Sequence, residues 1–297
     1  MAIAAFIGDT HGNLKLMWDL AVKWQERTGI KLDWIFQVGD FGIWPALDRL
    51  DPYTVKHAEK FDYPLKEAFG DFQEIFLGGH EIPIPTYFIR GNHEDQEFLM
   101  TFEKRLMQER PKDYLDHSIQ VCPNLHYLPD GHIITLDGIR IAGWGGQWAK
   151  NTWNLEYWGA ERAVRNKNGY ANRLNHMTRD RFERLIRSQF DVLVTHDAPT
   201  GAGVRGAPNP DKSLLDPETL TEDNPDGTGV PYIRELIETV RPRYHFNGHW
   251  HEFHKTIYNE SKYGGNVSGL GETTSFVLDK VHPDGQEDRR CMEIIEL

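Results

Sequence analysis

The chain has 297 residues, with 33 basic and 45 acidic side chains and a formal net charge of −12. Hydrophobic residues make up 39% of the sequence, enough for a sizeable core, which excludes a wholly disordered chain. No apolar stretch reaches the ~18 residues of a membrane span, and the first residues lack the basic segment of a signal peptide. Cys122 and Cys291 are too few for a disulfide framework. We therefore expect a cytoplasmic protein with no membrane partner.

The charge balance also bears on nucleic acid as a partner. Proteins that bind duplexes without sequence preference do so by neutralising phosphates with a surplus of basic side chains. Here acidic side chains are in excess, so we expect no strong non-specific binding of duplex nucleic acid. A phosphate-ester substrate stays compatible with the sequence, because bound divalent cations can reverse the local potential.

Short apolar segments, each followed by a polar loop, recur along the chain. They span residues 2–7, 34–38, 86–89, 191–194 and 243–246. An amphipathic helix containing Leu16, Leu20 and Trp24 follows the first segment and ends at Gly29, and another helix is predicted near residues 96–107. Strands that alternate with helices pair in parallel, and ligands bind beyond the carboxyl ends of such strands. The pattern therefore predicts that five loops meet at one edge.

The rest of the chain is expected to complete a single domain over residues 1–297. A hairpin with Asp137-Gly138 as its turn is predicted between residues 125 and 143. Further short strands are predicted at residues 256–258, 267–270, 276–278 and 292–297, which we interpret as a second sheet packed on the first. Insertions are expected near residues 43–85 and 200–231. The second is rich in Gly, Pro and Asp, and a loop of that length is typical of a lid.

Side chains that can bind metal ions follow each of the five expected strands. They are Asp9, His11, Asp40, Asn92, His196, His249 and His251. A mixture of carboxylate, amide and imidazole donors suits Zn, Mn, Fe or Ni. One ion takes about four to six ligands, so seven candidates indicate two ions, with Asp40, alone in its loop, as the bridge. Two adjacent ions activate water and hold the oxygens of an in-line displacement, which is the chemistry of phosphoester hydrolysis. The alternative is that these residues only form turns and caps.

In order and composition, these segments resemble the five signatures of the calcineurin-like metallophosphoesterase superfamily. The matching segments are Gly8-Asp9-x-His11-Gly12, Gly39-Asp40, Gly91-Asn92-His93-Glu94, Thr195-His196 and Gly248-His249-x-His251. The resemblance implies an α/β fold, a sandwich of two β-sheets flanked by helices, with a dimetal site at the carboxyl-end edge of the strands. It also implies two divalent ions, one bound by Asp9, His11 and His251 and the other bound by Asn92, His196 and His249. Asp40 is implied to bridge the two ions, which carry the attacking hydroxide.

The resemblance gives His93 a different role from its neighbours. It is implied to contact the phosphate and to protonate the departing oxygen rather than to bind metal. Proton transfer of this kind contributes typically ~10²–10⁴-fold to the rate. The alternative is that His93 is a structural histidine.

The residues after Asp40 bear on which subclass of metallophosphoesterases this chain resembles. Protein Ser/Thr phosphatases and dinucleoside-polyphosphate hydrolases usually carry an Arg-Gly dipeptide there, whereas this chain has Phe41-Gly42-Ile43. The segments at 91–94, 123–125 and 140–143 are similar to the RNA lariat-debranching branch and related bacterial and phage phosphodiesterases, although debranching enzymes often have Cys at the position of Asp9. We therefore predict a phosphodiesterase, whose substrates include esters derived from nucleotides or nucleic acids. The alternatives are a phosphomonoesterase and a catalytically silent metal-binding scaffold.

Several side chains outside the signatures allow two interpretations. Trp144, Trp148, Trp153 and Trp158 form either a stacking platform for a base or, as we favour, ordinary packing. Arg205, in the second insertion, is a candidate for pairing with a substrate phosphate. Asn151 and Arg162 either contact phosphate or lie on a solvated face. Glu94 and Asp197 are expected to orient neighbouring imidazoles or, alternatively, to cap helices.

Overall fold

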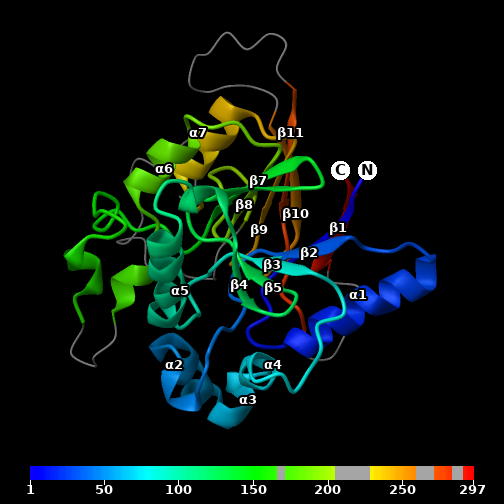
Figure 1. Cartoon of the computed structure of the whole chain (residues 1–297), viewed down its shortest axis with the longest axis vertical. Coiled ribbons are helices and arrows are strands. Elements are labelled where there is room, and N and C mark those ends of the chain that lie inside the picture. Colours follow the sequence, from blue (N-terminus) through cyan, green and yellow to red (C-terminus); the bar gives the residue numbers. More distant parts are fainter. Residues whose placement is uncertain (166–170, 205–227, 259–270, 283–289) are drawn as a thin grey trace.

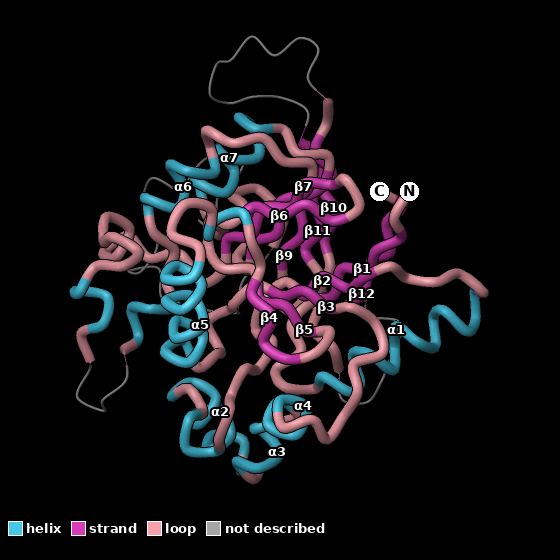
Figure 2. Tube along the Cα trace, in the orientation of Figure 1, coloured by secondary structure: helices cyan, strands magenta, loops and turns pink. Residues whose placement is uncertain are grey.

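The computed structural model describes residues 1–165, 171–204, 228–258, 271–282 and 290–297. Two β-sheets lie between groups of helices (Figure 1; Figure 2). The predicted α/β sandwich of two sheets flanked by helices is therefore confirmed. Arg205, most of the expected lid and the strand expected at 267–270 lie outside the described residues.

The first sheet contains both ends of the described chain. Its strand order is β12-β1-β2-β3-β5-β4. In that order the strands span Met292–Glu296, Ile3–Ile7, Trp34–Gln37, Thr86–Phe88, Leu125–Tyr127 and Ile119–Cys122. The four strands β1, β2, β3 and β5 are parallel, and the flanking β12 and β4 are antiparallel to their neighbours.

The second sheet has the order β10-β11-β9-β8-β7-β6. Its strands span His254–Tyr258, Thr273–Val277, Tyr244–Asn247, Val192–Thr195, Ile139–Trp144 and Ile133–Leu136. The inner strands pair in parallel, and the outer β10 and β6 are antiparallel. Each sheet therefore presents several parallel strands whose carboxyl ends point the same way.

Helices cover the outer faces of the two sheets. The longer helices are α1 (Leu14–Thr28), α2 (Pro52–Phe61), α5 (Gln96–Glu109), α6 (Arg179–Leu185) and α7 (Pro231–Val240). The short helices are α3 (Leu65–Phe69), α4 (Phe72–Phe76) and the 3₁₀ turns η1 (Leu47–Arg49), η2 (Tyr114–Asp116), η3 (Ala160–Ala163) and η4 (Asn172–Asn175). Apolar residues of α1, α4 and α5 pack on the first sheet, and those of α6 and α7 pack on the second.

Alternation along β1 shows why the first sheet is buried on both faces. Ala5 and Ile7 pack against the helices, whereas Ala4 and Phe6 face the second sheet, as expected when successive side chains point to opposite faces. The ring of Phe6 stacks on Phe246 of β9 with centroids 3.6 Å apart. This contact joins the centres of the two sheets.

Two sequence predictions about strand placement were wrong in part. The Asp137-Gly138 turn is confirmed, with both residues at positive φ, but it joins β6 to β7, while Leu125–Tyr127 pairs with β3 in the other sheet. The C-terminal strands were expected to form a second sheet packed on the first. Instead β10 and β11 extend a sheet built on β8 and β9, and β12 returns to pair with β1. Pairing partners of this kind are non-local, so alternation within each strand does not specify them.

The first insertion is helical. It contains η1, α2, α3 and α4, and Figure 1 shows the three helices gathered at one end of the molecule. Helix α2 begins at Asp51, whose carboxylate accepts hydrogen bonds from the backbone N–H groups of Tyr53 and Thr54, with Pro52 in the first turn. An N-cap of this type fixes where the helix starts. No helix in the described part of the chain is long and apolar enough to cross a membrane.

Candidate metal centre

The seven predicted ligands follow five parallel strands and meet at their carboxyl ends. Asp9 and His11 follow β1, Asp40 follows β2, Asn92 follows β3, His196 follows β8, and His249 and His251 follow β9. Their ligand atoms form two groups, each with atoms within 4.8 Å of one another: Asp9, His11 and His251, and Asp40, His196 and His249. Asn92 joins the second group, because its Oδ1 lies 3.0 Å from His196 Nε2.

Asp40 lies between the two groups. Its Oδ1 is 3.4 Å from His196 Nε2, and its Oδ2 is 3.9 Å from His11 Nε2. The carboxylate is buried, and burial by itself would raise its pKa. The positive charges of the surrounding histidines outweigh burial, so the pKa of Asp40 is held well below its usual range. Asp40 is therefore an ionised carboxylate with one oxygen toward each group.

The hydrogen bonds of His196 decide which of its nitrogens can bind a cation. Its Nδ1 lies 3.1 Å from the carbonyl oxygen of Val38 and donates to it. In the neutral imidazole, Nε2 then carries a lone pair, and this atom faces the Asn92 and Asp40 oxygens. Burial lowers the pKa of His196, but the charge of Asp40 outweighs burial and raises it to about 10, so Nε2 holds a proton between these oxygens unless a cation takes its place. The donor set therefore fits divalent transition ions.

The first group is equally compact. His251 Nε2 lies 3.0 Å from Asp9 Oδ2 and 2.9 Å from His11 Nε2. Asp9 is fully buried, and its Oδ1 and Oδ2 also accept hydrogen bonds from the backbone N–H of His249. These hydrogen bonds join the loop after β9 to the loop after β1 and so connect the two sheets at the site.

The backbone of the site adopts conformations that side chains rarely take. His11, Asp40, His249 and His251 have φ between 44° and 70°, the left-handed region, which costs free energy for residues other than glycine. Glycines beside them allow close approach: a Cβ at Gly91 would lie 2.0 Å from Asp40 Oδ1, and one at Gly248 would lie 2.0 Å from Asp9 Oδ1. The glycines of the signatures are therefore sterically required.

His93 is held from helix α2. Its Nδ1 lies 3.0 Å from Thr54 Oγ1 and 3.3 Å from Asp51 Oδ1. Thr54 donates its own proton to Asp51 Oδ2 at 2.6 Å, so the hydroxyl accepts a hydrogen bond from His93 Nδ1–H. Burial lowers the pKa of His93, but the charges of Asp40 and Asp51 outweigh burial and raise it to about 9. The Nε2 of His93 is the nitrogen that these contacts leave for a substrate.

The calcineurin-like phosphoesterase family matches residues 4–253 of this chain. The chain belongs to this family. Members of this family are metal-dependent phosphoester hydrolases, the class that the signatures predicted. Calcineurin-like phosphoesterases use divalent metals, and the two groups of ligand atoms are the candidate positions for them.

Curated relatives of this calcineurin-like chain are lariat debranching enzymes. That of Caenorhabditis elegans is 25% identical over 99% of this chain and 55% of its own length. That of Saccharomyces cerevisiae is 27% identical over 82% of this chain and 55% of its own, and that of Entamoeba histolytica is 23% identical over 84% and 64%. This chain thus spans about half the length of the curated relatives it matches. A solved structure aligns over 94% of this chain with a TM-score of 0.49 and 13% identity.

Two residues that hold His93 were missed by sequence reasoning. Asp51 and Thr54 lie about 40 positions before the third signature, inside the first insertion. The Asp51-Pro52 pair does signal a helix start. Nothing in its spacing connects that start to His93, because the contact depends on how α2 packs against the loop after β3.

Glu94 does not cap the helix that follows it, because the N-cap of α5 is Asp95. The carboxylate of Glu94 accepts hydrogen bonds from the backbone N–H groups of Phe41, Gly42 and Ile43 at 2.7–3.0 Å. Burial and the charge of Asp40 raise the pKa of Glu94 to about 8. Glu94 therefore fixes the loop that carries Asp40. Asp197 accepts a hydrogen bond from the indole of Trp250 at 3.1 Å, and its negative charge acts on the neighbouring imidazole of His249.

The residue before the third signature, Arg90, connects several loops under the site. Its guanidinium pairs with buried Asp130, with Nη2 2.5 Å from Oδ2, and donates to the carbonyl groups of Leu174 and His176. Arg162 is buried beside it and donates to backbone carbonyls, so both predictions for Arg162, a phosphate contact and a solvated face, are wrong.

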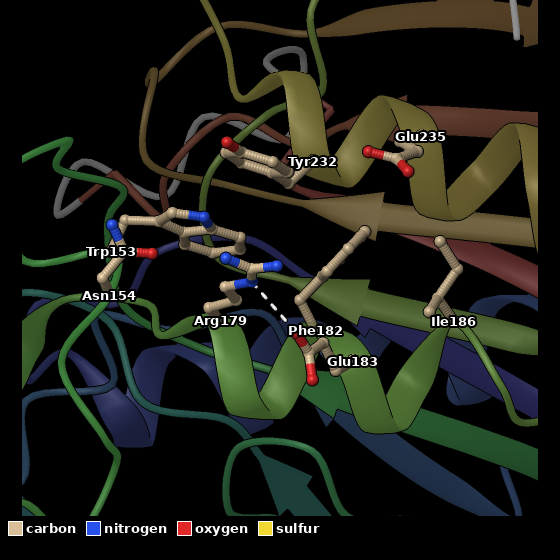
Figure 3. Close-up of a pocket in the computed structure, with 8 residues that line it drawn as sticks. All are labelled: Trp153, Asn154, Arg179, Phe182, Glu183, Ile186, Tyr232 and Glu235. Atoms are coloured by element: carbon tan, nitrogen blue, oxygen red, sulfur yellow. Dashed lines mark hydrogen bonds and ion pairs between the residues drawn. The ribbon is translucent and has the colours of Figure 1, made fainter.

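The clustered tryptophans belong mainly to the core. Trp144 and Trp153 are buried and pack with residues of α6 and α7 over the second sheet, which confirms packing for these two. A cavity of about 570 Å³ lies next to Trp153, and Figure 3 shows this ring stacked on Tyr232 at the cavity wall, with centroids 3.9 Å apart. Neither group of candidate metal ligands lines this cavity.

Proposed function

We propose that this calcineurin-like phosphoesterase hydrolyses phosphodiesters, including those of nucleotides and nucleic acids. Two divalent ions, drawn from Mn, Fe, Zn and Ni, are the proposed cofactors. In this proposal one is held by Asp9, His11 and His251 and the other by Asn92, His196 and His249, with Asp40 shared between them. We also propose that the whole chain is one domain, because both sheets supply ligands.

The position of Asp40 carries the proposal. One of its oxygens faces each group of ligand atoms, and its low pKa keeps it charged. A shared carboxylate of this kind is what two adjacent cations need, since it compensates both charges. When bound, such ions lower the pKa of water and neutralise phosphate charge.

The remaining chemistry falls to the chain's own residues. His93 is oriented through its Nδ1 by Thr54 and Asp51, and its backbone N–H donates to Asp40 Oδ1 at 2.7 Å. We assign Nε2 of His93 as the donor that protonates the leaving oxygen. An alkoxide leaves poorly without a proton, so this step matters for alkyl and nucleoside esters.

Two observations favour diesters over monoesters. The relatives named above are lariat debranching enzymes, and opening a lariat is hydrolysis of a phosphodiester. The residues after Asp40 are Phe41-Gly42-Ile43, without the Arg-Gly pair expected of protein phosphatases. Both point to a diester substrate and neither requires a lariat.

The test compares bis-p-nitrophenyl phosphate with p-nitrophenyl phosphate. Protein stripped of metal and reloaded with Mn²⁺ is expected to hydrolyse the diester faster than the monoester, and Asp40→Asn is expected to lose both metal and activity. A preference for the monoester would make the protein a phosphomonoesterase. No turnover of either ester by protein that binds metal would indicate the catalytically silent scaffold.

A further inference from the structure

Helix α2 carries a row of exposed rings. Tyr53, His57 and Phe61 follow one another at four-residue spacing, which places them on one face of a helix. Tyr53 is 45% exposed and Phe61 is 58% exposed, although large aromatic side chains are usually buried. The buried residues of α2 are Thr54 and Ala58, which lie on the neighbouring face of the helix. We call Tyr53, His57 and Phe61 the α2 aromatic face.

This face begins at the candidate metal centre. The ring of Tyr53 lies 6.2 Å from that of His93, with the two planes at 74°. The ring of His57 lies 4.6 Å from that of Phe61, farther along the helix. The first turn of α2 also supplies the two side chains that hold His93. A ligand whose reacting phosphate is at His93 can therefore continue directly over α2.

The α2 aromatic face is also basic, in a chain whose net charge is −12. Lys56 and Lys60 are exposed, and at 100° per residue they fall with the three rings in an arc of about 140°. No acidic residue of α2 lies in that arc. The ammonium group of Lys60 is 5.1 Å from the ring of Phe61. After burial, the charges of His93, Lys280 and Lys60 are the main causes that lower the pKa of His57, so positive charge lies close to this ring.

We propose that the α2 aromatic face binds an unpaired nucleic-acid strand that flanks the scissile phosphodiester. Bases stack on Tyr53 and Phe61, while Lys56 and Lys60 pair with the strand's phosphates. Exposed rings interleaved with cations are what single strands require, because stacking uses base faces that a duplex conceals. From residue 53 to residue 61 the helix rises about 12 Å, the length of three or four nucleotides. The proposal rests on the proposed phosphodiesterase function and deepens it.

The first test measures binding separately from turnover. Fluorescence anisotropy of labelled eight-nucleotide RNA and DNA strands with phosphorothioate linkages is recorded on Mn²⁺-loaded protein. Phe61→Ala is expected to weaken binding at least about 5-fold, as for the loss of one base stack, and Phe61→Trp to preserve it. Phe61→Leu keeps an apolar side chain but no ring, and it is expected to behave like Phe61→Ala. The matched control is Leu77→Ala, at the 75% exposed residue that ends α4.

The second test concerns the lysines. The slope of log K against log salt concentration is about −0.7 for each phosphate contact with a single strand. The Lys56→Gln/Lys60→Gln double variant is therefore expected to reduce the magnitude of this slope by about 1.4. Lys23→Gln, at an exposed lysine of α1, serves as the control and is expected to leave the slope as it is.

The outcomes separate this proposal from the phosphodiesterase assignment. If the protein hydrolyses the small diester but the Phe61 variants all bind the strands alike, the strand-binding proposal is wrong and the assignment stands. If binding follows the ring at position 61 while no diester is hydrolysed, the assignment is wrong and the strand-binding surface stands. Equal binding of duplex and single strand would overturn the stacking argument. A loss of dimers in Phe61→Ala with unchanged strand binding would instead identify a self-association surface.

Discussion

The contact between Asp51 and His93 allows a substitution that changes chemistry with little effect on the fold. In Asp51→Asn, the amide oxygen still caps α2 by accepting from the N–H groups of residues 53 and 54, so the free energy of unfolding should change little. The amide N–H₂, however, donates to Thr54 instead of accepting its proton. Thr54 is then free to donate to His93 Nδ1, and the negative charge at position 51 that raises the pKa of His93 is lost.

The expected loss depends on the leaving group. His93 contributes as an acid only when the departing oxygen needs a proton, so a dinucleoside monophosphate should lose about 10²-fold in kcat, the lower end of the range for acid catalysis. Bis-p-nitrophenyl phosphate has a leaving group that is stable as an anion, and its kcat should change by less than about 3-fold. Steady-state kinetics with both esters, at fixed Mn²⁺, measures the difference.

The control and the refuting result are equally specific. Asp51→Ala removes the cap as well and should cost about 1 kcal/mol in urea unfolding, a loss that Asp51→Asn avoids. Should Asp51→Asn slow both esters equally while its unfolding curve matches the parent protein, Asp51 does not act through the acid and the assignment of His93 fails.

Other substitutions test the packing beneath the site. His132 is buried, with Nδ1 donating to the His117 carbonyl at 2.8 Å, and burial lowers its pKa to about 3. In the unfolded chain this histidine binds a proton as the pH falls below about 6.5, whereas in the folded protein it stays neutral. The stability that neutral, buried His132 contributes is therefore present above pH 6.5 and is lost as the pH falls, by about 2 kcal/mol at pH 5. His132→Asn, which keeps the donor, should flatten the urea-unfolding free energy between pH 7 and pH 5; an unchanged slope contradicts this. Arg90→Met leaves Asp130 buried without its partner and should cost about 3–5 kcal/mol in unfolding, whereas a loss below 1 kcal/mol would mean that Asp130 finds another donor. Gly91→Ala places a Cβ against Asp40 Oδ1 and should lower Mn²⁺ affinity, measured by calorimetry; unaltered affinity would show that the loop can relax.

The sequence was sufficient to predict the parallel strands and the residues that end them. Each apolar segment and its following Gly-Asp, Asn-His or Gly-His is local, so its position could be recognised without knowing its neighbours. Convergence of the loops then followed from the rule that parallel strands share one carboxyl edge.

What the sequence could not specify depends on non-local contacts. The assignment of Leu125–Tyr127 to the first sheet requires its pairing with β3, about 40 residues earlier. Arg162 is charged and was expected at the surface, yet carbonyl groups from two loops satisfy its guanidinium in the interior. The role of Asp51 similarly depends on the packing of an insertion. In each case the residue that makes the contact lies in a distant segment, and the sequence pattern of that segment does not indicate the contact.

The candidate ligands come from both sheets, so the metal centre at the sheet edge depends on how the two sheets pack in the core. Asp9, His11 and Asp40 extend from one sheet and His196 and His249 from the other, while Phe6 and Phe246 meet between them. Cations bound at the rim would act as cross-links that oppose any sliding of the two layers. We expect chelation to lower the melting temperature as well as to stop catalysis, because an ion that binds only the folded form stabilises it by mass action. By the same coupling, we expect repacking of Phe6 or Phe246, each three residues before a candidate ligand, to change metal affinity.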